Sequence, residues 1–525
     1  MRRPALALVA GIAVLAATLV AAPAVRADQA AGADTRYETI PGAGGTPLKA
    51  LVVTPRGLGD GPFPLLVMPS SWGMPHLEYV GAAAKLAYES GYAVVSYSSR
   101  GFWDSGGQVD VADRPTVRDV SKVIDWAVAN AHADPRRVGA MGVSYGAGTS
   151  LLAAASDSRI KAVGALSTWT ELPASLYPNQ TVNKQAGELL LALAHLTGRP
   201  APVLREVEAS YRRGDMERAV KLLEGHSPAE YMDRLNANRP AVFLGNAWAD
   251  SMFPPGTVTD FFTELTGPKK LMLGPGDHSS QEAFGLAGLP NAVWDTAARW
   301  MDHYVAGEDN GIAAEDPVVV KAPKGENWAG YPSWPAFTGE PERLHLGAGG
   351  ALAPEPATGW RTTIDANVPT AADSGTAIVT GTLQGLGLPA ATSLPLVARH
   401  AAGVWVGAPR ARPGEVRGAP RLRATVTPSA ADTSLFAYLY DVDATGTAAL
   451  VTHKPLSLRD ATPGEAQRVD LGLDPISWHV PAGHRLALVV DTVDPRYKDV
   501  STPKSTVTFS SPADAPSTLT VPLAG

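Results

Sequence analysis

The sequence predicts two folded parts, an α/β domain with a mainly parallel sheet and an all-β domain that follows it. The first prediction rests on short apolar runs that alternate with helical periodicity from Pro64 onward. The second rests on a change near Asp316, after which Pro, Gly and β-forming residues dominate and turn residues separate short strand patterns. With 525 residues, 45% of them hydrophobic, the chain can build two or more cores.

The first domain is predicted over residues 35–312. Two strands joined by a glycine-rich turn, 37–40 and 48–54, indicate an antiparallel start to the sheet. Residues 170–238 are rich in Leu, Ala, Glu and Arg with helical periodicity, which predicts a helical cap with helices at 186–196 and 201–223. A β-sandwich is predicted over 315–525. The remaining elements expected in the first domain are strands at 64–69, 92–97, 137–143, 160–166, 239–246 and 270–274, and a helix at 292–304.

The most informative segment is Met141-Gly142-Val143-Ser144-Tyr145-Gly146, which contains Gly-x-Ser-x-Gly between a strand pattern and a helix pattern. In a nucleophile elbow the serine lies on a sharp, strained turn, and the residues two before and two after it must be nearly free of side chains. Both are glycine here. The segment therefore favours Ser144 as the nucleophile of a serine hydrolase.

A serine hydroxyl is a weak nucleophile at neutral pH, so this interpretation requires a histidine base and an orienting carboxylate later in the chain. Asp250 follows the strand predicted at 239–246, and His278 follows the next one, which gives the order serine, acid, histidine. Because parallel strands end at one edge of a sheet, the three side chains can converge there. Asp260 and Asp277 are alternative acids. The histidines without such a placement are His76, His132, His195, His226 and His303, for which surface or structural roles are expected.

Several segments together resemble one known family, the one that unites X-prolyl dipeptidyl-peptidases, bacterial cocaine esterase and α-amino-acid ester hydrolases. The similar segments are the Arg-Gly-x-x-x-Ser-x-Gly loop within 99–107, the Gly-Val-Ser-Tyr-Gly elbow, the Trp-x-Asp that ends at Asp250, and the Gly-Pro-x-x-His of 274–278. Segments 435–443 and 480–486 resemble its non-catalytic domain. The resemblance implies an α/β-hydrolase domain with a helical cap, followed by an all-β jelly-roll sandwich.

One position departs from that family. Its members typically place a tyrosine after the proline that ends the third strand, where the hydroxyl helps to bind the oxyanion, but this chain has Ser70 after Pro69. The first oxyanion donor is then expected to be the backbone N–H of Tyr145. The second is expected to be the Ser70 hydroxyl, or a backbone N–H near Ser71 and Trp72.

The resemblance implies removal of an X-Pro dipeptide as the first expectation, with an esterase or acylase acting on small esters or amides as the alternative. A catalytically degenerate binding module is the second alternative. A dipeptidyl-peptidase needs a carboxylate for the free amino terminus of its substrate, and Glu78, Asp104 and Glu171 are candidates. The tryptophans expected either to line a substrate pocket or to belong to the core are Trp72, Trp103, Trp169 and Trp248.

The N-terminus is typical of a secretory signal peptide, expected to span residues 1–27. Arg2 and Arg3 precede an apolar run over 5–20, and small residues follow before Ala24 and Ala27. A retained membrane anchor is the alternative, and secretion without stable membrane association is the expectation. The net charge of −7 without a basic run argues against nucleic acid as a partner. With no cysteine, metal-ligand spacing or phosphate loop, no cofactor or metal is expected, only a small ester or peptide substrate.

Overall fold

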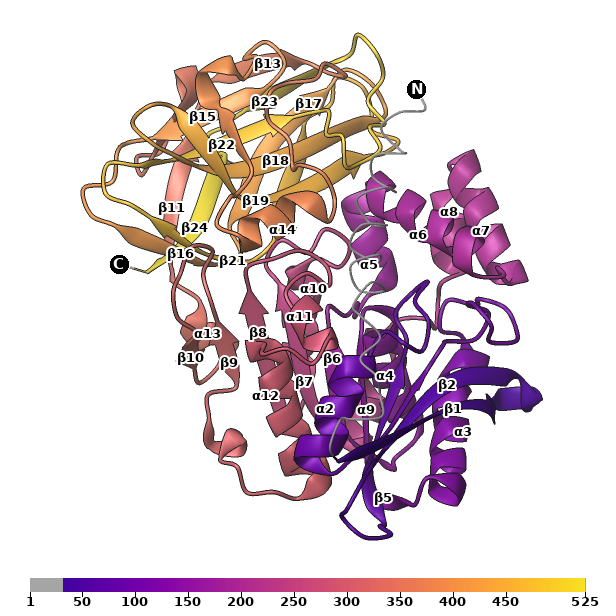
Figure 1. The fold of residues 1–525 in the computed structure, drawn as a ribbon. Coiled ribbons are helices and arrows are strands. Elements are labelled where there is room, and N and C mark those ends of the chain that lie inside the picture. The colour runs from indigo at the N-terminus through magenta and orange to yellow at the C-terminus, as the bar shows by residue number, and fades with distance from the viewer. Residues whose placement is uncertain (1–31, 525) are drawn as a thin grey trace.

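The computed structural model describes residues 32–524, in which two large sheets follow one another along the chain (Figure 1). The α/β domain, coloured indigo to rose, occupies the lower part of the view, and the orange and yellow β-domain lies above it. This arrangement confirms the predicted fold class. The predicted signal peptide at 1–27 lies outside the described residues.

The first sheet has ten strands within the described residues, in the order β1-β2-β4-β3-β5-β6-β7-β8-β9-β10. The pairs β1–β2 and β2–β4 are antiparallel, as is β9–β10, and the strands between pair in parallel. The strands are β1 (Ala33–Pro41), β2 (Pro47–Pro55), β3 (Phe63–Pro69), β4 (Ala93–Tyr97), β5 (Ala133–Val143), β6 (Ile160–Leu166), β7 (Ala241–Ala247), β8 (Lys269–Gly274), β9 (Val318–Val320) and β10 (Ala329–Tyr331).

Helices cover both faces of this sheet, which explains why its central strands are apolar throughout. Every residue of β3 and β7 is buried. The helices that pack on one face are α3 (Arg114–Asn130), α4 (Tyr145–Ser156), α9 (Met232–Asn238) and α10 (Pro255–Glu264). Those on the other face are α2 (Val80–Ser90), the short α11 (Ala283–Leu286) and α12 (Ala292–Met301), the last of which continues into a π-helical turn at 302–306.

A helical cap connects β6 to β7 and consists of α5 (Leu172–Leu176), α6 (Lys184–Thr197), α7 (Pro202–Arg213) and α8 (Met216–Lys221). The helical periodicity expected over 201–223 is divided between two helices, α7 and α8. Gly214 takes a left-handed conformation with φ of 81° and ends α7, and the Asp215 side chain accepts a hydrogen bond from Arg218 N to begin α8. Figure 1 shows these helices beside the junction of the two domains.

The second sheet has fourteen strands within the described residues and is almost entirely antiparallel, with β12–β15 as its parallel pair. Its buried strands, such as β18, form the predicted β-sandwich core. The short helices are α13 (Trp334–Phe337) and α14 (Val379–Gly385). The strands are β11 (Glu340–Leu346), β12 (Ala351–Ala353), β13 (Arg361–Asp365), β14 (Ala391–Ser393), β15 (Gly403–Gly407), β16 (Gly414–Gly418), β17 (Arg421–Pro428), β18 (Thr433–Val442), β19 (Thr447–Leu458), β20 (Gln467–Gly472), β21 (Ile476–Val480), β22 (Arg485–Asp491), β23 (Thr506–Ser510) and β24 (Thr518–Ala524).

Candidate active site

Ser144 lies on the turn between β5 and α4, in a strained backbone conformation with φ of 55° and ψ of −117°. Its flanking glycines are required by close contacts. A Cβ on Gly146 would lie 2.0 Å from the Pro69 carbonyl oxygen, and one on Gly142 would lie 2.7 Å from the Gly146 carbonyl carbon. The strand, turn and helix thus present the Ser144 side chain at the carboxyl edge of the sheet.

A chain of hydrogen bonds links Ser144 to two residues from the loops after β7 and β8. Ser144 Oγ lies 2.8 Å from His278 Nε2, and His278 Nδ1 lies 3.0 Å from Asp250 Oδ2. All three side chains are buried. The other carboxylate oxygen of Asp250 accepts hydrogen bonds from the backbone N–H groups of Met252 and Phe253, so its orientation is fixed.

The charge state of His278 is set by its surroundings. Burial, the largest single effect, favours the neutral ring, but the Asp250 carboxylate together with Glu282 and Asp277 outweighs it, and the pKa of His278 is raised. Glu282 is completely buried, adds to this effect, and has neither carboxylate oxygen in a well-formed hydrogen bond within the described residues. Burial raises the pKa of Glu282 to about 7, although the Ser167 hydroxyl partly opposes the rise. The His278 ring thus has three acidic side chains in its surroundings.

Asp277, the alternative acid, has a different position from Asp250. Its Oδ1 accepts hydrogen bonds from Ser251 N at 2.7 Å and from His278 N at 2.8 Å, while its Oδ2 accepts one from Gly381 N of α14 at 3.1 Å. Asp277 therefore joins the acid loop, the histidine loop and the β-domain. No local pattern in the sequence indicates this role, because Gly381 is distant in the chain. Asp260, the other alternative, is exposed on α10.

The candidate oxyanion donors lie between the elbow and the end of β3. The backbone N–H of Tyr145 is in the first turn of α4 and finds no acceptor within residues 32–524. The Ser70 hydroxyl donates to Ser99 Oγ at 3.4 Å and accepts a hydrogen bond from Ser99 N, and the Ser71 hydroxyl donates to the Val143 carbonyl. Neither hydroxyl is therefore left free to bind an oxyanion.

The backbone N–H groups of this segment differ from one another. Ser71 N donates to the Glu78 carboxylate at 2.7 Å. The Trp72 N–H is without an acceptor in the described part of the chain. The carboxylate of Glu78, a candidate for binding a substrate amino terminus, thus already accepts a hydrogen bond from the backbone N–H of Ser71. The other two candidates, Asp104 and Glu171, are exposed and do not line the pocket next to Ser144.

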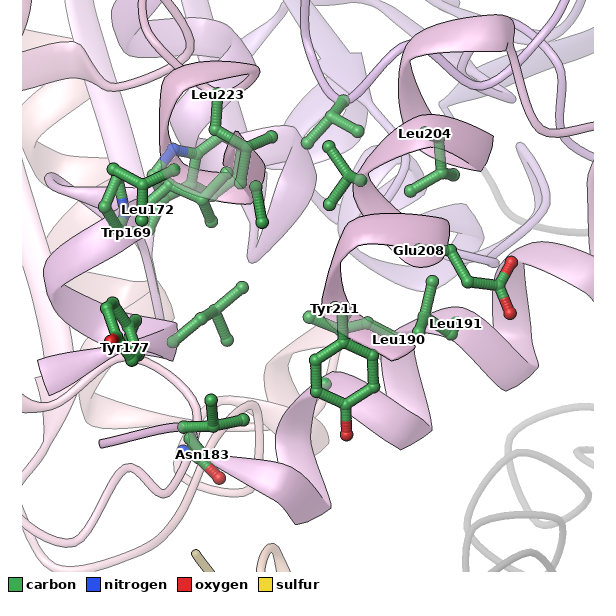
Figure 2. Close-up of a pocket in the computed structure, with 18 of the residues that line it drawn as sticks. Trp169, Leu172, Tyr177, Asn183, Leu190, Leu191, Leu204, Glu208, Tyr211 and Leu223 are labelled. Atoms are coloured by element: carbon green, nitrogen blue, oxygen red, sulfur yellow. The ribbon is translucent and has the colours of Figure 1, made fainter. Parts of the chain in front are cut away.

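A pocket with an empty volume of about 1000 Å³, partly open to solvent, begins at Ser144 and Tyr145 and extends beneath the cap. Its wall is apolar and comes from all four cap helices, with residues such as Leu172, Leu191 and Leu204. Figure 2 shows these side chains surrounding an open space, with Glu208 at its margin and the carboxylate directed outward. Glu208 is paired with His195 at 2.7 Å and with Arg212 at 2.9 Å.

The four candidate tryptophans separate into two pairs. Trp72 and Trp169 line the pocket, and Trp169 stacks on Tyr145 with ring centroids 5.8 Å apart. Trp103 is 46% exposed and donates its indole N–H to the Gly73 carbonyl, away from the pocket wall. Trp248 stacks on Phe337 and donates to the Lys321 carbonyl. It lines a separate, polar cavity between the domains.

Two family models match consecutive parts of the chain. The model for X-Pro dipeptidyl-peptidase (S15 family) matches residues 44–280, and the model for the X-Pro dipeptidyl-peptidase C-terminal non-catalytic domain matches 310–520. The chain belongs to the S15 family. The resemblance inferred from the sequence motifs is thereby confirmed.

Solved structures similar to this S15 chain share its fold along nearly the whole length. An aminopeptidase from the marine sediment archaeon Thaumarchaeota archaeon has a TM-score of 0.75 at 16% identity, covering 94% of this chain and 97% of its own. An α-amino acid ester hydrolase labelled with selenomethionine has a TM-score of 0.74 at 17% identity, covering 96% and 98%.

Among curated proteins, the "Putative serine esterase Mb1866c" of Mycobacterium bovis is 26% identical over 300 residues. The match covers 51% of this chain and 47% of that protein, so the S15 chain spans about half the length of the curated relative. The "Uncharacterized protein YcjY" of Escherichia coli is 38% identical over 89 residues, which cover 17% of this chain and 29% of that protein.

No group of three or more His, Cys, Asp or Glu residues between 32 and 524 could hold a metal ion. Over the same residues, no helix combines the length and the apolar character needed to cross a bilayer.

Proposed function

We propose that the protein is a secreted serine hydrolase that cleaves carboxylic esters through Ser144, His278 and Asp250. The observation that carries this proposal is the chain of hydrogen bonds from Ser144 Oγ through the imidazole to the Asp250 carboxylate. This is the arrangement that activates a serine hydroxyl for attack on a carbonyl carbon. Membership of the S15 family supports it.

In the first half of the reaction, Ser144 Oγ attacks the ester carbonyl while His278 Nε2 takes its proton. The Asp250 carboxylate accepts a hydrogen bond from Nδ1–H of His278, which holds the ring in the required tautomer and stabilises the imidazolium. His278 then gives the proton to the departing alcohol and an acyl-enzyme forms. In the second half, His278 takes a proton from water, the hydroxide releases the acyl group as an acid, and Ser144 regains its proton.

The negative charge that develops on the carbonyl oxygen needs hydrogen-bond donors that are already in place. We assign this role to the backbone N–H groups of Tyr145 and Trp72, because both lack acceptors in the described residues and both residues line the pocket at Ser144. This assignment replaces the Ser70 and Ser71 hydroxyls, which are engaged with Ser99 and Val143. A backbone donor also explains how the chain can function without the tyrosine typical of the family.

An ester substrate is favoured over an X-Pro dipeptide by the walls of the pocket. A dipeptidyl-peptidase must bind the substrate's ammonium group, and a buried charge of that kind needs a carboxylate partner. Among the described residues, the one carboxylate on the pocket wall is that of Glu208, which is already paired with His195 and Arg212 and points outward. Dipeptidyl-peptidase activity stays the second candidate, favoured by the description of the matching family model.

The test compares a p-nitrophenyl ester with a glycyl-prolyl-p-nitroanilide for the wild type and for Ser144→Ala. We expect ester turnover with a covalent acyl-enzyme on Ser144, visible as a mass increase, and loss of both in the variant. Turnover of the amide at a comparable kcat/KM would instead establish the dipeptidyl-peptidase. If neither substrate labels Ser144, the protein is a binding module without catalysis.

Secretion is a separate part of the proposal and rests on residues 1–27. Expression of the full chain in a bacterial host, followed by N-terminal sequencing of the protein from the medium, should show cleavage after Ala24 or Ala27. An uncleaved chain beginning at Met1 in the membrane fraction would overturn it.

A further inference from the structure

One face of helix α6 forms a side of the pocket. Asn183 caps this helix, and it lines the pocket together with Gly187, Leu190 and Leu191. Their spacing of four, three and one residues places them along one stripe of an α-helix. The stripe faces the space beneath the cap, and Gly187 is the position on it that carries no side chain.

Nothing in the local backbone explains a glycine at this position. Gly187 lies inside α6 and its backbone φ is not in the left-handed region. A Cβ added there would meet no atom within 4 Å, whereas at Gly146 and Gly148 it would meet neighbours at 2.0 and 2.5 Å. Glycine in a helix interior costs roughly 1 kcal/mol of stability relative to alanine. Glycine at position 187 therefore makes α6 less stable, and its structural effect is to leave open space in the pocket.

We propose that Gly187 determines substrate size, and that the space it leaves accepts an extended apolar chain of the substrate. The proposal rests on the ester hydrolase function given above and deepens it. The chain is carried by either the acyl or the alcohol part of the ester, since Ser144 itself lines the pocket and either part can occupy the space next to it.

The chemistry of the wall supports an apolar chain rather than a polar group. Three polar side chains of the wall are engaged with protein. Tyr211 donates to Glu188, Trp72 donates to the Leu190 carbonyl, and Asn183 donates to the Ser251 carbonyl. Val207, Ala219, Val220 and Leu223 supply apolar surface from α7 and α8 and the turn after α8. A hydrocarbon chain there exchanges water for apolar contacts and leaves these three polar side chains with their protein partners.

The test is a chain-length profile with two arms, p-nitrophenyl esters from acetate to dodecanoate and acetate esters of alcohols of the same lengths. In the wild type, kcat/KM should rise by about fourfold for each added methylene in one arm, until the pocket is filled. The arm that shows the rise identifies which part of the ester enters the pocket. A flat profile in both arms would overturn the proposal.

The variant Gly187→Leu fills the open space with apolar atoms, and Gly187→Ala is its matched control. For Leu, in the arm that shows the rise, the ratio of kcat/KM for the ten-carbon chain to that for the two-carbon chain should fall at least tenfold, with a much smaller fall for Ala. An unchanged ratio for Gly187→Leu would contradict the proposal. Both substitutions favour the helix, so the thermal midpoint should not fall.

A binding measurement separates this inference from the catalytic one. Decanoate titrated into the Ser144→Ala variant by calorimetry should bind, and the added Gly187→Leu substitution should weaken it at least tenfold. If decanoate binds in this way but no ester is cleaved by the wild type, the catalytic proposal fails and the pocket assignment stands. If esters are cleaved but decanoate does not bind, the reverse holds.

Discussion

The carboxyl edge of the first sheet and the pocket beneath the cap meet at Ser144, but the edge consists of polar groups and the pocket wall of apolar side chains. At the edge, polar groups from three loops are joined by directed hydrogen bonds, such as those of Asp250 and Asp277. The pocket wall is made of Leu, Val and aromatic side chains that contribute shape and volume. Directed bonds determine a reaction, and an apolar volume determines which molecules reach it. Changes in the two regions should therefore have different kinetic signatures.

The largest effect is expected from Asp250→Asn at the edge. An amide at this position donates where the carboxylate accepted, so His278 loses its tautomer and its partner charge. We expect kcat/KM to fall by about 10⁴ for esters of every chain length. The matched control is Asp260→Asn, exposed on α10, which should retain wild-type rates. A loss confined to long-chain esters would mean that edge and pocket are not separable.

The second-largest effect tests whether the β-domain helps to position the residues at the carboxyl edge of the first sheet. In Asp277→Asn the amide oxygen can still accept from Ser251 N and His278 N, but the amino group faces Gly381 N–H instead of a carboxylate oxygen. Losing a buried hydrogen bond costs about 1–3 kcal/mol, so kcat should fall roughly tenfold or more with little change in KM. The exposed Asp373 provides a control as Asp373→Asn.

The same contact can be reached from the β-domain through Gly381→Ala. The added methyl group would lie 2.6 Å from Asp277 Oδ2 and 2.8 Å from the Ala249 carbonyl, so one of these must move. We expect a fall in kcat similar to that of Asp277→Asn, and a double variant that is less than additive, because both break one contact. Wild-type kinetics in Gly381→Ala would show that the second domain does not position the site.

The pH dependence gives a smaller, separate test of the edge. His278 acts as a base only when neutral, and the Asp250 carboxylate raises its pKa despite the opposing effect of burial. Activity should therefore be lost as pH falls through a pKa above the ordinary 6.5 of imidazole. When kcat/KM is plotted against pH, acetyl and decanoyl esters should lose activity on the acid side, the acidic limb of the profile, at the same pH. If the pH of this loss differed between the two esters, filling the pocket would affect the protonation of His278.

The smallest effect is expected from Glu282→Gln. The Glu282 carboxylate contributes to the raised pKa of His278 from within the core, so its removal should move the acidic limb toward lower pH by a fraction of a unit. The limiting kcat should change little, since Asp250 still orients the ring. An unmoved limb with a lowered kcat would assign Glu282 a structural role only.

Much of the edge followed from the sequence because its signals are local. The elbow needs glycines at fixed offsets from Ser144, and the ends of consecutive parallel strands must share one edge, so Asp250 and His278 were placed near Ser144. The sequence patterns indicate the residues of the pocket less clearly. Trp72 and Trp169 were named together with Trp103 and Trp248, and nothing in the local pattern separates the two that line it.

The sequence by itself determined the fold class, the change from α/β to all-β structure, the helical character of the cap and the order of the three residues in the hydrogen-bonded chain. These depend on periodicity and on short offsets along the chain. Only the tertiary structure decided that the Ser70 and Ser71 hydroxyls have partners, that Asp277 meets Gly381, and that Gly187 faces an empty volume. Each of these depends on what lies opposite a residue in space, and that is fixed by packing between segments far apart in sequence.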